Sequence, residues 1–207
     1  MAGKTLPYWN HNAAYYPWIA AQTKRCGRIL DVGCGDGTLA HYLADDARTV
    51  VGIDPFKDGI ARAKEKQTDA DVRFEVCSFE AYEGADGSFD AVIFAASLHH
   101  LDAKAAIQKA VRLLDADGVL IVVGLAKPET VGEKLLDAAR CIPSLVISKL
   151  HGMKDTEALN IPVSYSFDTM RQIRAIADEM LPGASARQAL HYRYLLKWKK
   201  SPQRIDK

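Results

Sequence analysis

The residues best suited to chemistry are an acid and three glycines in one short stretch. Asp31 stands two positions before Gly33, and Gly35 and Gly37 follow at every second position. Glycine has no Cβ and tolerates positive φ, so a ligand can lie against the backbone here. The five residues before Gly33 form an apolar run, and a helical pattern opens at Thr38. The pattern therefore predicts a buried strand, a turn and a helix start whose free amide groups face a ligand.

A second acid, Asp54, ends the β-branched run Thr49–Asp54, about 20 residues past the glycine turn. A carboxylate in that place can accept hydrogen bonds from both hydroxyls of a ribose; the alternative is a surface acid at a strand end. The dinucleotide fingerprint requires Gly-x-Gly-x-x-Gly. Here the third glycine comes one residue early and Thr38 holds the expected position, so the stretch departs from that fingerprint.

Several histidines are candidates for a proton acceptor by residue type alone, because imidazole titrates near neutral pH. They are His11, His99, His100 and His151. The alternative for the adjacent pair is capping and packing of the following helix. Adjacent histidines lack the spacing of a helical metal pair, and the four cysteines are scattered without a Cys-x-x-Cys motif. We therefore expect no metal site.

Alternating strand and helix patterns must position these residues. Strands are expected at residues 28–32, 49–54, 72–76, 89–96 and 119–124, and helices from Thr38, from 57 to 67 and after a capping Asp102. Residues 115–118 are expected to turn the chain. Ser166 or Asp168 should cap a final helix through Leu181, and 187–190 and 193–198 should form an edge pair of strands. Strands and helices that alternate with short turns indicate parallel strands covered by helices on both faces.

Two segments fall outside this alternation. Residues 1–25 concentrate aromatic side chains, which predicts either a lid over the bound ligands or a helix packed on the sheet. As a lid, the segment would bring Tyr15 or Tyr16 near the ligand and let His11 face the acceptor. Residues 127–163 indicate either an insertion that walls an acceptor pocket or a packing helix. No domain boundary is evident, so we expect one domain over residues 1–207.

The stretch from Asp31 to Gly37 has the pattern Asp/Glu-x-Gly-x-Gly-x-Gly, and it resembles motif I of the class I S-adenosylmethionine-dependent methyltransferases. Residues 89–92 resemble the Phe-Asp-x-Val strand of that family, and residues 98–101 its Leu-His-His-Leu-like turn. The resemblance covers about residues 29–124 and is to type 11-like small-molecule methyltransferases. It implies an α/β fold with a doubly wound, mostly parallel seven-stranded sheet, Rossmann-like, whose last strand is antiparallel.

The resemblance also implies S-adenosylmethionine as the cofactor and assigns residues to it. The methionine moiety would contact Asp31 and the backbone of residues 33–35, and the ribose would contact Asp54. Many family members have an acid at the position of Ser78, so a serine hydroxyl or the amide of Phe79 would contact the adenine instead. The assigned cofactor residues are Asp31, Gly33, Cys34, Gly35, Asp54, Pro55, Phe56, Ser78, Phe79 and Ala95, to which the lid hypothesis adds Tyr15 and Tyr16.

The composition bounds the acceptor. The chain has 207 residues and a net charge of +1, which gives no strong case for nucleic acid or a membrane surface. Without a signal peptide or an apolar run of about 18 residues, we expect a cytoplasmic protein. We predict a methyltransferase (EC 2.1.1) with a small-molecule acceptor, as a monomer or homodimer. The alternatives are a methyltransferase acting on tRNA or protein, and a protein that binds S-adenosylmethionine without catalysis.

Overall fold

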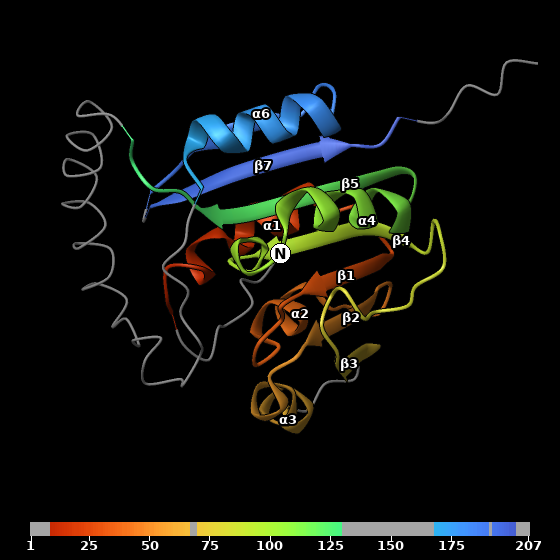
Figure 1. The fold of residues 1–207 in the computed structure, drawn as a ribbon. Coiled ribbons are helices and arrows are strands. Elements are labelled where there is room, and N and C mark those ends of the chain that lie inside the picture. Colours follow the sequence, from red (N-terminus) through yellow and green to blue (C-terminus); the bar gives the residue numbers. More distant parts are fainter. Residues whose placement is uncertain (1–8, 67–69, 130–167, 191, 202–207) are drawn as a thin grey trace, which may run out of the picture.

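The computed structural model describes residues 9–66, 70–129, 168–190 and 192–201, and in these ranges one sheet organises the chain (Figure 1). Its seven strands lie in the order β3-β2-β1-β4-β5-β7-β6. They are β1 (Arg28–Val32), β2 (Thr49–Asp54), β3 (Val72–Val76), β4 (Phe89–Ala95), β5 (Leu114–Leu125), β6 (Ser185–Gln188) and β7 (Arg193–Lys199).

Strands β1 to β5 pair in parallel, whereas β7 runs antiparallel to both β5 and β6. The expected α/β fold with an antiparallel last strand is confirmed. Strand β1 lies between β2 and β4, so the strand order reverses there. In sheets of this kind ligands bind outside the carboxyl ends of the strands at such a reversal, which places the expected site at the ends of β1 and β4.

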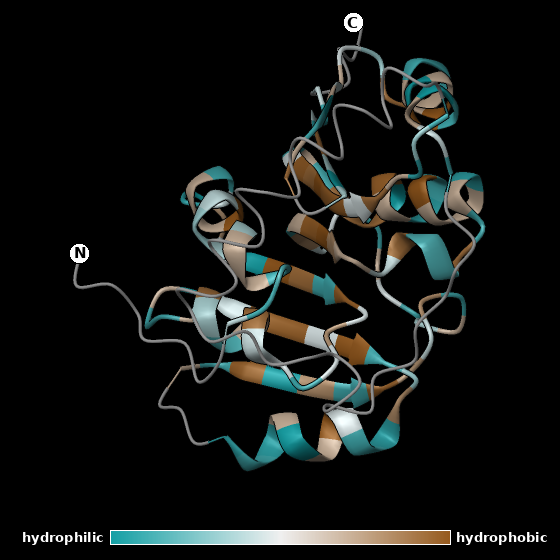
Figure 2. Ribbon diagram, turned by 90° about the vertical axis from the view of Figure 1, so that its left-hand side faces the viewer, coloured by the Kyte–Doolittle hydropathy of each residue, from teal (hydrophilic) through white to brown (hydrophobic). Residues whose placement is uncertain are grey.

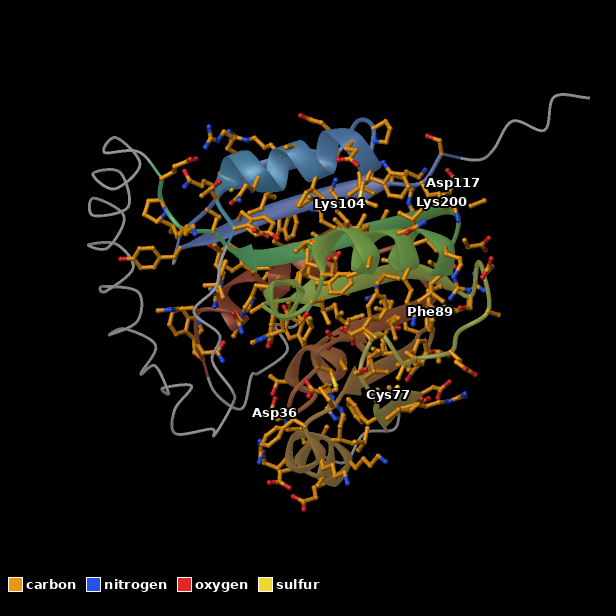
Figure 3. All side chains as sticks on the ribbon, in the orientation of Figure 1. Asp36, Cys77, Phe89, Lys104, Asp117 and Lys200 are labelled. Atoms are coloured by element: carbon orange, nitrogen blue, oxygen red, sulfur yellow. The ribbon has the colours of Figure 1, made fainter. Side chains whose placement is uncertain are left out.

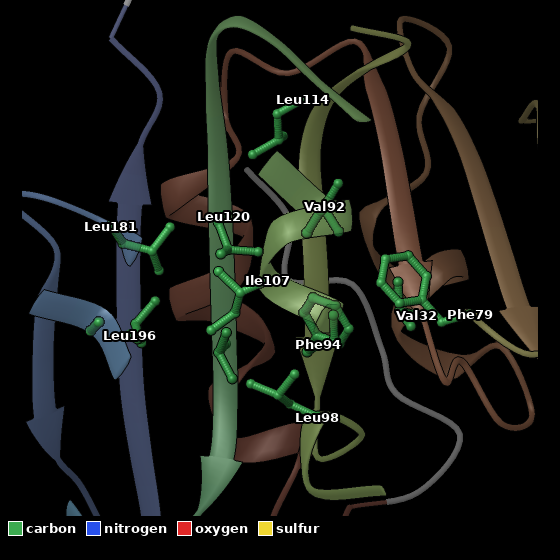
Figure 4. Close-up of a cluster of buried hydrophobic side chains, with 14 of the residues drawn as sticks. Val32, Phe79, Val92, Phe94, Leu98, Ile107, Leu114, Leu120, Leu181 and Leu196 are labelled. Atoms are coloured by element: carbon green, nitrogen blue, oxygen red, sulfur yellow. The ribbon is translucent and has the colours of Figure 1, made fainter. Parts of the chain in front are cut away.

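Helices cover both faces of the sheet. They are α1 (Tyr16–Gln22), α2 (Thr38–Leu43), α3 (Lys57–Glu65), α4 (Ala103–Leu113) and α6 (Met170–Met180), with 3-10 turns η1 (Ala13–Tyr15) and η2 (Leu98–His100). Side chains alternate along β4, so that Val92 and Phe94 join a cluster with α4 and α6 (Figure 4), while Ile93 joins a second cluster with α1, α2 and α3. Figure 2 shows the apolar colouring concentrated on the central strands.

The N-terminal segment belongs to the second cluster. Ile19 is fully buried and Tyr16 is 6% exposed, and both pack with residues of α2 and β1. Trp9, Tyr15 and Trp18 are partly buried against the same cluster. The described part of this segment is therefore packed on the sheet, and its expected role as a lid stays a prediction.

Two local expectations are wrong. Residues 115–118 are expected as a turn before the strand, but β5 already begins at Leu114. Its register with β4 shifts between the pairs Phe89–Leu114 and Ala91–Val119, with Asp117 at φ +66°. A bulge absorbs the turn-forming residues within the strand. The last helix is capped by Thr169, not by Asp168, because the Thr169 hydroxyl accepts from the Gln172 amide and the Gln172 side chain accepts from the Thr169 amide.

Other expectations fall on residues that the structure does not describe. Ser166, His151 and most of the segment 127–163 lie outside the described ranges, so the insertion and the single domain over 1–207 stay predictions. In the ranges that are described, every helix is too short or too polar to cross a bilayer.

Candidate functional site

A cavity of about 390 Å³ opens where the carboxyl ends of β1, β2, β3 and β4 meet the N-terminal segment. It therefore lies at the reversal of strand order, where the topology places a ligand. The lining residues are Asn10, Asn12, Tyr16, Asp31, Val32, Gly33, Cys34, Gly35, Asp36, Leu39, Ile53, Asp54, Pro55, Phe56, Cys77, Ser78, Phe79, Glu80, Ala95, Ala96, Ser97, His100 and Leu101. In Figure 3, Asp36 and Cys77 mark the side of the molecule that carries α2, α3 and β3.

Asp31 contributes a buried carboxylate to this cavity. Its side chain is at the end of β1 and 1% exposed, and neither carboxylate oxygen has a hydrogen-bond partner among the described residues. Burial, followed by the nearby charges of Asp54 and Asp36, raises the pKa of Asp31 to about 7. A buried carboxylate is costly unless it is paired, so the site is suited to a ligand group that carries a positive charge.

The glycine turn shapes the floor of the cavity. Gly35 has φ +55°, and a Cβ built on it would meet nothing within 4 Å. The space above its backbone is open to a ligand, and a side chain would fill it. Gly33 has φ +71° and no such room, because its Cβ would lie 2.4 Å from the Cβ of Ser97. The Ser97 hydroxyl donates to the carbonyl of Val32, which holds the end of β4 against the turn.

Asp54 ties the end of β2 to the same turn. One of its carboxylate oxygens accepts from the amide of Gly35 at 2.9 Å, and the other accepts from the amide of Phe56 at 2.8 Å. Each oxygen can accept a further hydrogen bond. Asp54 can thus hold the turn in place and bind a pair of ligand hydroxyls as well.

Asp36 is a third acid in the wall, and its environment is the opposite of that of Asp31. It accepts from the Thr38 hydroxyl at 2.7 Å and pairs with the Lys66 ammonium at 3.0 Å. Burial acts to raise the pKa of Asp36, but the Thr38 hydrogen bonds and Lys66 outweigh it, so that the pKa is lowered. Asp36 therefore has hydrogen-bond partners within the protein, whereas Asp31 has none among the residues that the structure describes.

The loop after β3 forms another part of the wall. Lys109 on α4 donates to the carbonyls of Phe79 and Glu80 at 2.7 and 2.9 Å, and its ammonium lies 5.2 Å from the centre of the Phe79 ring. The Phe79 ring also meets Phe94 edge-on. These contacts fix the backbone of residues 78–80 at the cavity.

The end of β4 carries a strained residue. Ala96 has φ +61°, which is uncommon for a residue with a side chain, and its amide donates to the carbonyl of Val123 at 2.7 Å. His100 follows on η2 and lines the cavity. His99 contributes to a separate, smaller pocket beside α6 and β7, and burial, followed by His100 and Arg193, lowers its pKa to about 4.

The structure brings most of the predicted site residues to one cavity, but not all of them. His11, His99 and Tyr15 do not line it: the Tyr15 hydroxyl donates to the carbonyl of Leu190 at 2.6 Å, and the His11 ring lies edge-on to Trp9. The remaining predicted residues do line it, namely Asp31, Gly33, Cys34, Gly35, Asp54, Pro55, Phe56, Ser78, Phe79, Ala95, Tyr16 and His100. The roles assigned to all of them stay predictions.

Sequence reasoning missed several lining residues, above all Asn10, Asn12 and Ser97. The two asparagines stand within the aromatic N-terminal segment, and their polar side chains could have indicated contact with a ligand. Ser97 follows the predicted strand directly. Among the described residues, no group of three or more His, Cys, Asp or Glu side chains could hold a metal ion.

Comparisons with known proteins agree with this geometry. The chain matches the family described as "Methyltransferase domain" over residues 30–122. It is 29% identical over 196 residues to an uncharacterized methyltransferase of Mycobacterium tuberculosis, covering 92% of this chain and 96% of the relative. The fold is similar to that of the PH0226 protein of Pyrococcus horikoshii, with a TM-score of 0.65, 22% identity and coverage of 90% and 88%.

A further neighbour was solved with S-adenosylhomocysteine bound. It is the magnesium protoporphyrin IX methyltransferase of Synechocystis, with a TM-score of 0.60, 22% identity and coverage of 92% of this chain and 81% of the neighbour. Taken with the sheet order and the glycine turn, these matches show a methyltransferase domain over residues 30–122 that has the fold of S-adenosylmethionine-dependent methyltransferases. The cofactor of this family is S-adenosylmethionine.

Proposed function

We propose that this protein transfers a methyl group from S-adenosylmethionine to a small-molecule acceptor by in-line displacement at the methyl carbon. The observation that carries the proposal is the buried carboxylate of Asp31, which has no partner among the described residues. It lies in the same cavity as Asp54 and the open backbone of Gly35. These three residues fit three features of a ligand: an ammonium group at Asp31, a chain that lies against the backbone of Gly35, and a ribose diol at Asp54.

The residues present fit the cofactor as follows. Asp31 would hold the amino group, the backbone of residues 33–35 would hold the methionine chain, and Asp54 would accept from the ribose hydroxyls. Phe56 and residues 78–79 would enclose the adenine, with Lys109 holding their loop in place. When bound, the cofactor supplies a methyl group activated by a positively charged sulfur.

The chain's remaining task is alignment of the acceptor and exclusion of water. The N-terminal segment, the end of β4 and η2 line the rest of the cavity, and His100 is the lining histidine that could accept a proton from a neutral acceptor. An acceptor that arrives as an anion would not need that step.

A small acceptor is supported by the size of the site and by the charge of the chain. The cavity falls in the range of small-molecule sites, about 300–1,000 Å³, and the net charge of +1 gives no strong case for a nucleic-acid acceptor. The Synechocystis neighbour is named for a small-molecule acceptor, magnesium protoporphyrin IX.

Calorimetry with S-adenosylhomocysteine and with NAD tests the cofactor assignment. We expect binding of S-adenosylhomocysteine and none of NAD, and the reverse would contradict the proposal. A thermal-shift screen of a metabolite library with S-adenosylhomocysteine present would then identify acceptors, and turnover with a hit would separate an enzyme from a protein that only binds the cofactor.

A further inference from the structure

Two asparagines of the N-terminal segment face the cavity with their amide oxygens already engaged. Asn10 is 6% exposed, and its Oδ1 accepts from the backbone amides of Asn12 and Ala13 at 3.0 and 2.9 Å. Only an oxygen can accept these bonds, so the orientation of the amide is fixed by its partners. The NH₂ group of Asn10 has no partner in the described part of the chain and remains as a donor.

Asn12 is oriented by an arginine from the other end of the chain. Its Oδ1 accepts from Nη2 of Arg193 at 2.5 Å. Because a guanidinium can only donate, the NH₂ group of Asn12 is also left as a donor. Both residues line the cavity, so two neutral donors are available to a ligand there.

Arg193 supplies a positive charge behind these donors. It is 9% exposed, and within the described ranges its Nε has no hydrogen-bond partner and no carboxylate forms an ion pair with it. As the first residue of β7 it lies opposite Leu125, at the carboxyl end of β5 and thus at the ligand-binding edge of the sheet. A buried cation without a counterion is costly, and an anionic ligand nearby would offset that cost.

The charges in the cavity are separated. The acids that line it, Asp31, Asp36, Asp54 and Glu80, lie on the β1 to β3 side. The lining residues from the N-terminal segment, the end of β4 and η2 include no acid. One side is therefore suited to the cationic part of the cofactor, and the other to an anion.

We propose that the amide groups of Asn10 and Asn12, with Arg193 behind them, form a carboxylate-binding subsite. The proposal rests on the proposed function and adds the chemical class of the group that this end of the cavity receives. The carboxylate belongs either to the acceptor or to the methionine end of the cofactor. Both sources present the same planar pair of oxygens to the same donors.

Asn10→Asp and Asn12→Asp test the subsite with little change of shape. In each variant the carboxylate keeps the hydrogen bonds that Oδ1 accepts, while a donor becomes a negatively charged acceptor. Gln22→Glu is the matched control: its Oε1 accepts from Lys197 at 2.7 Å, so it is the same exchange at the end of α1, away from the cavity. Circular dichroism and thermal melts of all three variants check the fold.

Calorimetry then uses three probes. S-adenosylhomocysteine carries the carboxylate, 5′-methylthioadenosine lacks it, and benzoate is added to protein saturated with S-adenosylhomocysteine. If the carboxylate is that of the cofactor, the Asn variants bind S-adenosylhomocysteine about tenfold or more weakly and 5′-methylthioadenosine unchanged. If it is that of the acceptor, the variants keep S-adenosylhomocysteine affinity and lose benzoate binding by about the same factor.

The proposal is overturned if neither Asn variant changes the affinity for S-adenosylhomocysteine and benzoate either does not bind or binds all variants alike. It is also overturned if Gln22→Glu weakens the carboxylate probes as much as the Asn variants do. Failure of the unaltered protein to bind either nucleoside is a different result, because it contradicts the cofactor assignment itself.

Discussion

Replacing Asp31 with Asn should stabilise the cofactor-free protein, and the gain should grow with pH. Burial, then Asp54 and Asp36, raises the pKa of Asp31 from 3.8 to about 7. A group whose folded pKa lies above its unfolded value contributes stability that is complete below the unfolded pKa and is lost as pH rises through the folded pKa. The full loss is about 4 kcal/mol, at about 1.4 kcal/mol for each pKa unit.

Chemical denaturation without cofactor at about pH 5 and about pH 8 measures this effect. Between those values the unaltered protein should lose about 2–3 kcal/mol relative to Asp31→Asn, which remains neutral. For a chain of this length that is a change of about 5–10 °C in the difference between melting temperatures. The same variant should bind S-adenosylhomocysteine more weakly, because the ammonium loses its counterion.

Asp36→Asn is the control for this prediction. The pKa of Asp36 is lowered, so its contribution is present above the unfolded pKa and is lost only at more acidic pH. That variant should be less stable than the unaltered protein by an amount that hardly changes between about pH 5 and about pH 8. If Asp31→Asn also shows a constant difference, or is destabilised at the higher pH, Asp31 does not carry the buried charge inferred for it.

Four further results are expected. Asp54→Ala should lower the affinity for S-adenosylhomocysteine at least about tenfold in calorimetry and also lower the melting temperature, because the amides of Gly35 and Phe56 lose their acceptor; unchanged affinity would make Asp54 a structural residue only. Gly35→Val should abolish cofactor binding measured in the same way, since its side chain would enter the open space at φ +55°; binding that survives would place the ligand elsewhere. Below pH 7 the affinity of the unaltered protein for S-adenosylhomocysteine should fall by up to about tenfold per pH unit, with proton release on binding, because Asp31 must ionise; a pH-independent affinity would contradict this. Hydrogen exchange at residues 9–12 should slow when S-adenosylhomocysteine is added, whereas the buried part of α1 should exchange slowly with or without it; exchange at 9–12 that ignores the ligand would remove this segment from the site.

The cofactor half of the site could be predicted because its signals are local. Asp31 and the glycines stand within a few positions of one another, and Asp54 ends the next strand at a distance that the fold dictates. The central strands β1, β2 and β4 were predictable for the same reason, since each is a short, mostly apolar run bounded by turn residues.

The other half depends on contacts that no local pattern encodes. Arg193 and Asn12 are 181 positions apart, and Tyr15 and Leu190 are 175 positions apart. Such pairings determine whether the side-chain oxygen of Asn12 is already hydrogen-bonded. They therefore also determine whether its NH₂ group remains as a donor for a ligand. The irregularity at residues 115–118 could not be predicted either, because residues typical of a turn can also lie within a strand where the pairing register shifts.

A crystal structure of the protein with S-adenosylhomocysteine tests the central claim most directly. We predict the ligand in the cavity at the ends of β1, β2 and β4, with its amino group within hydrogen-bonding distance of Asp31 and its ribose hydroxyls on Asp54. The sulfur should lie beside Ala95, open toward His100 and the asparagines. A ligand bound elsewhere, or bound here with Asp31 still unpaired, would contradict the account.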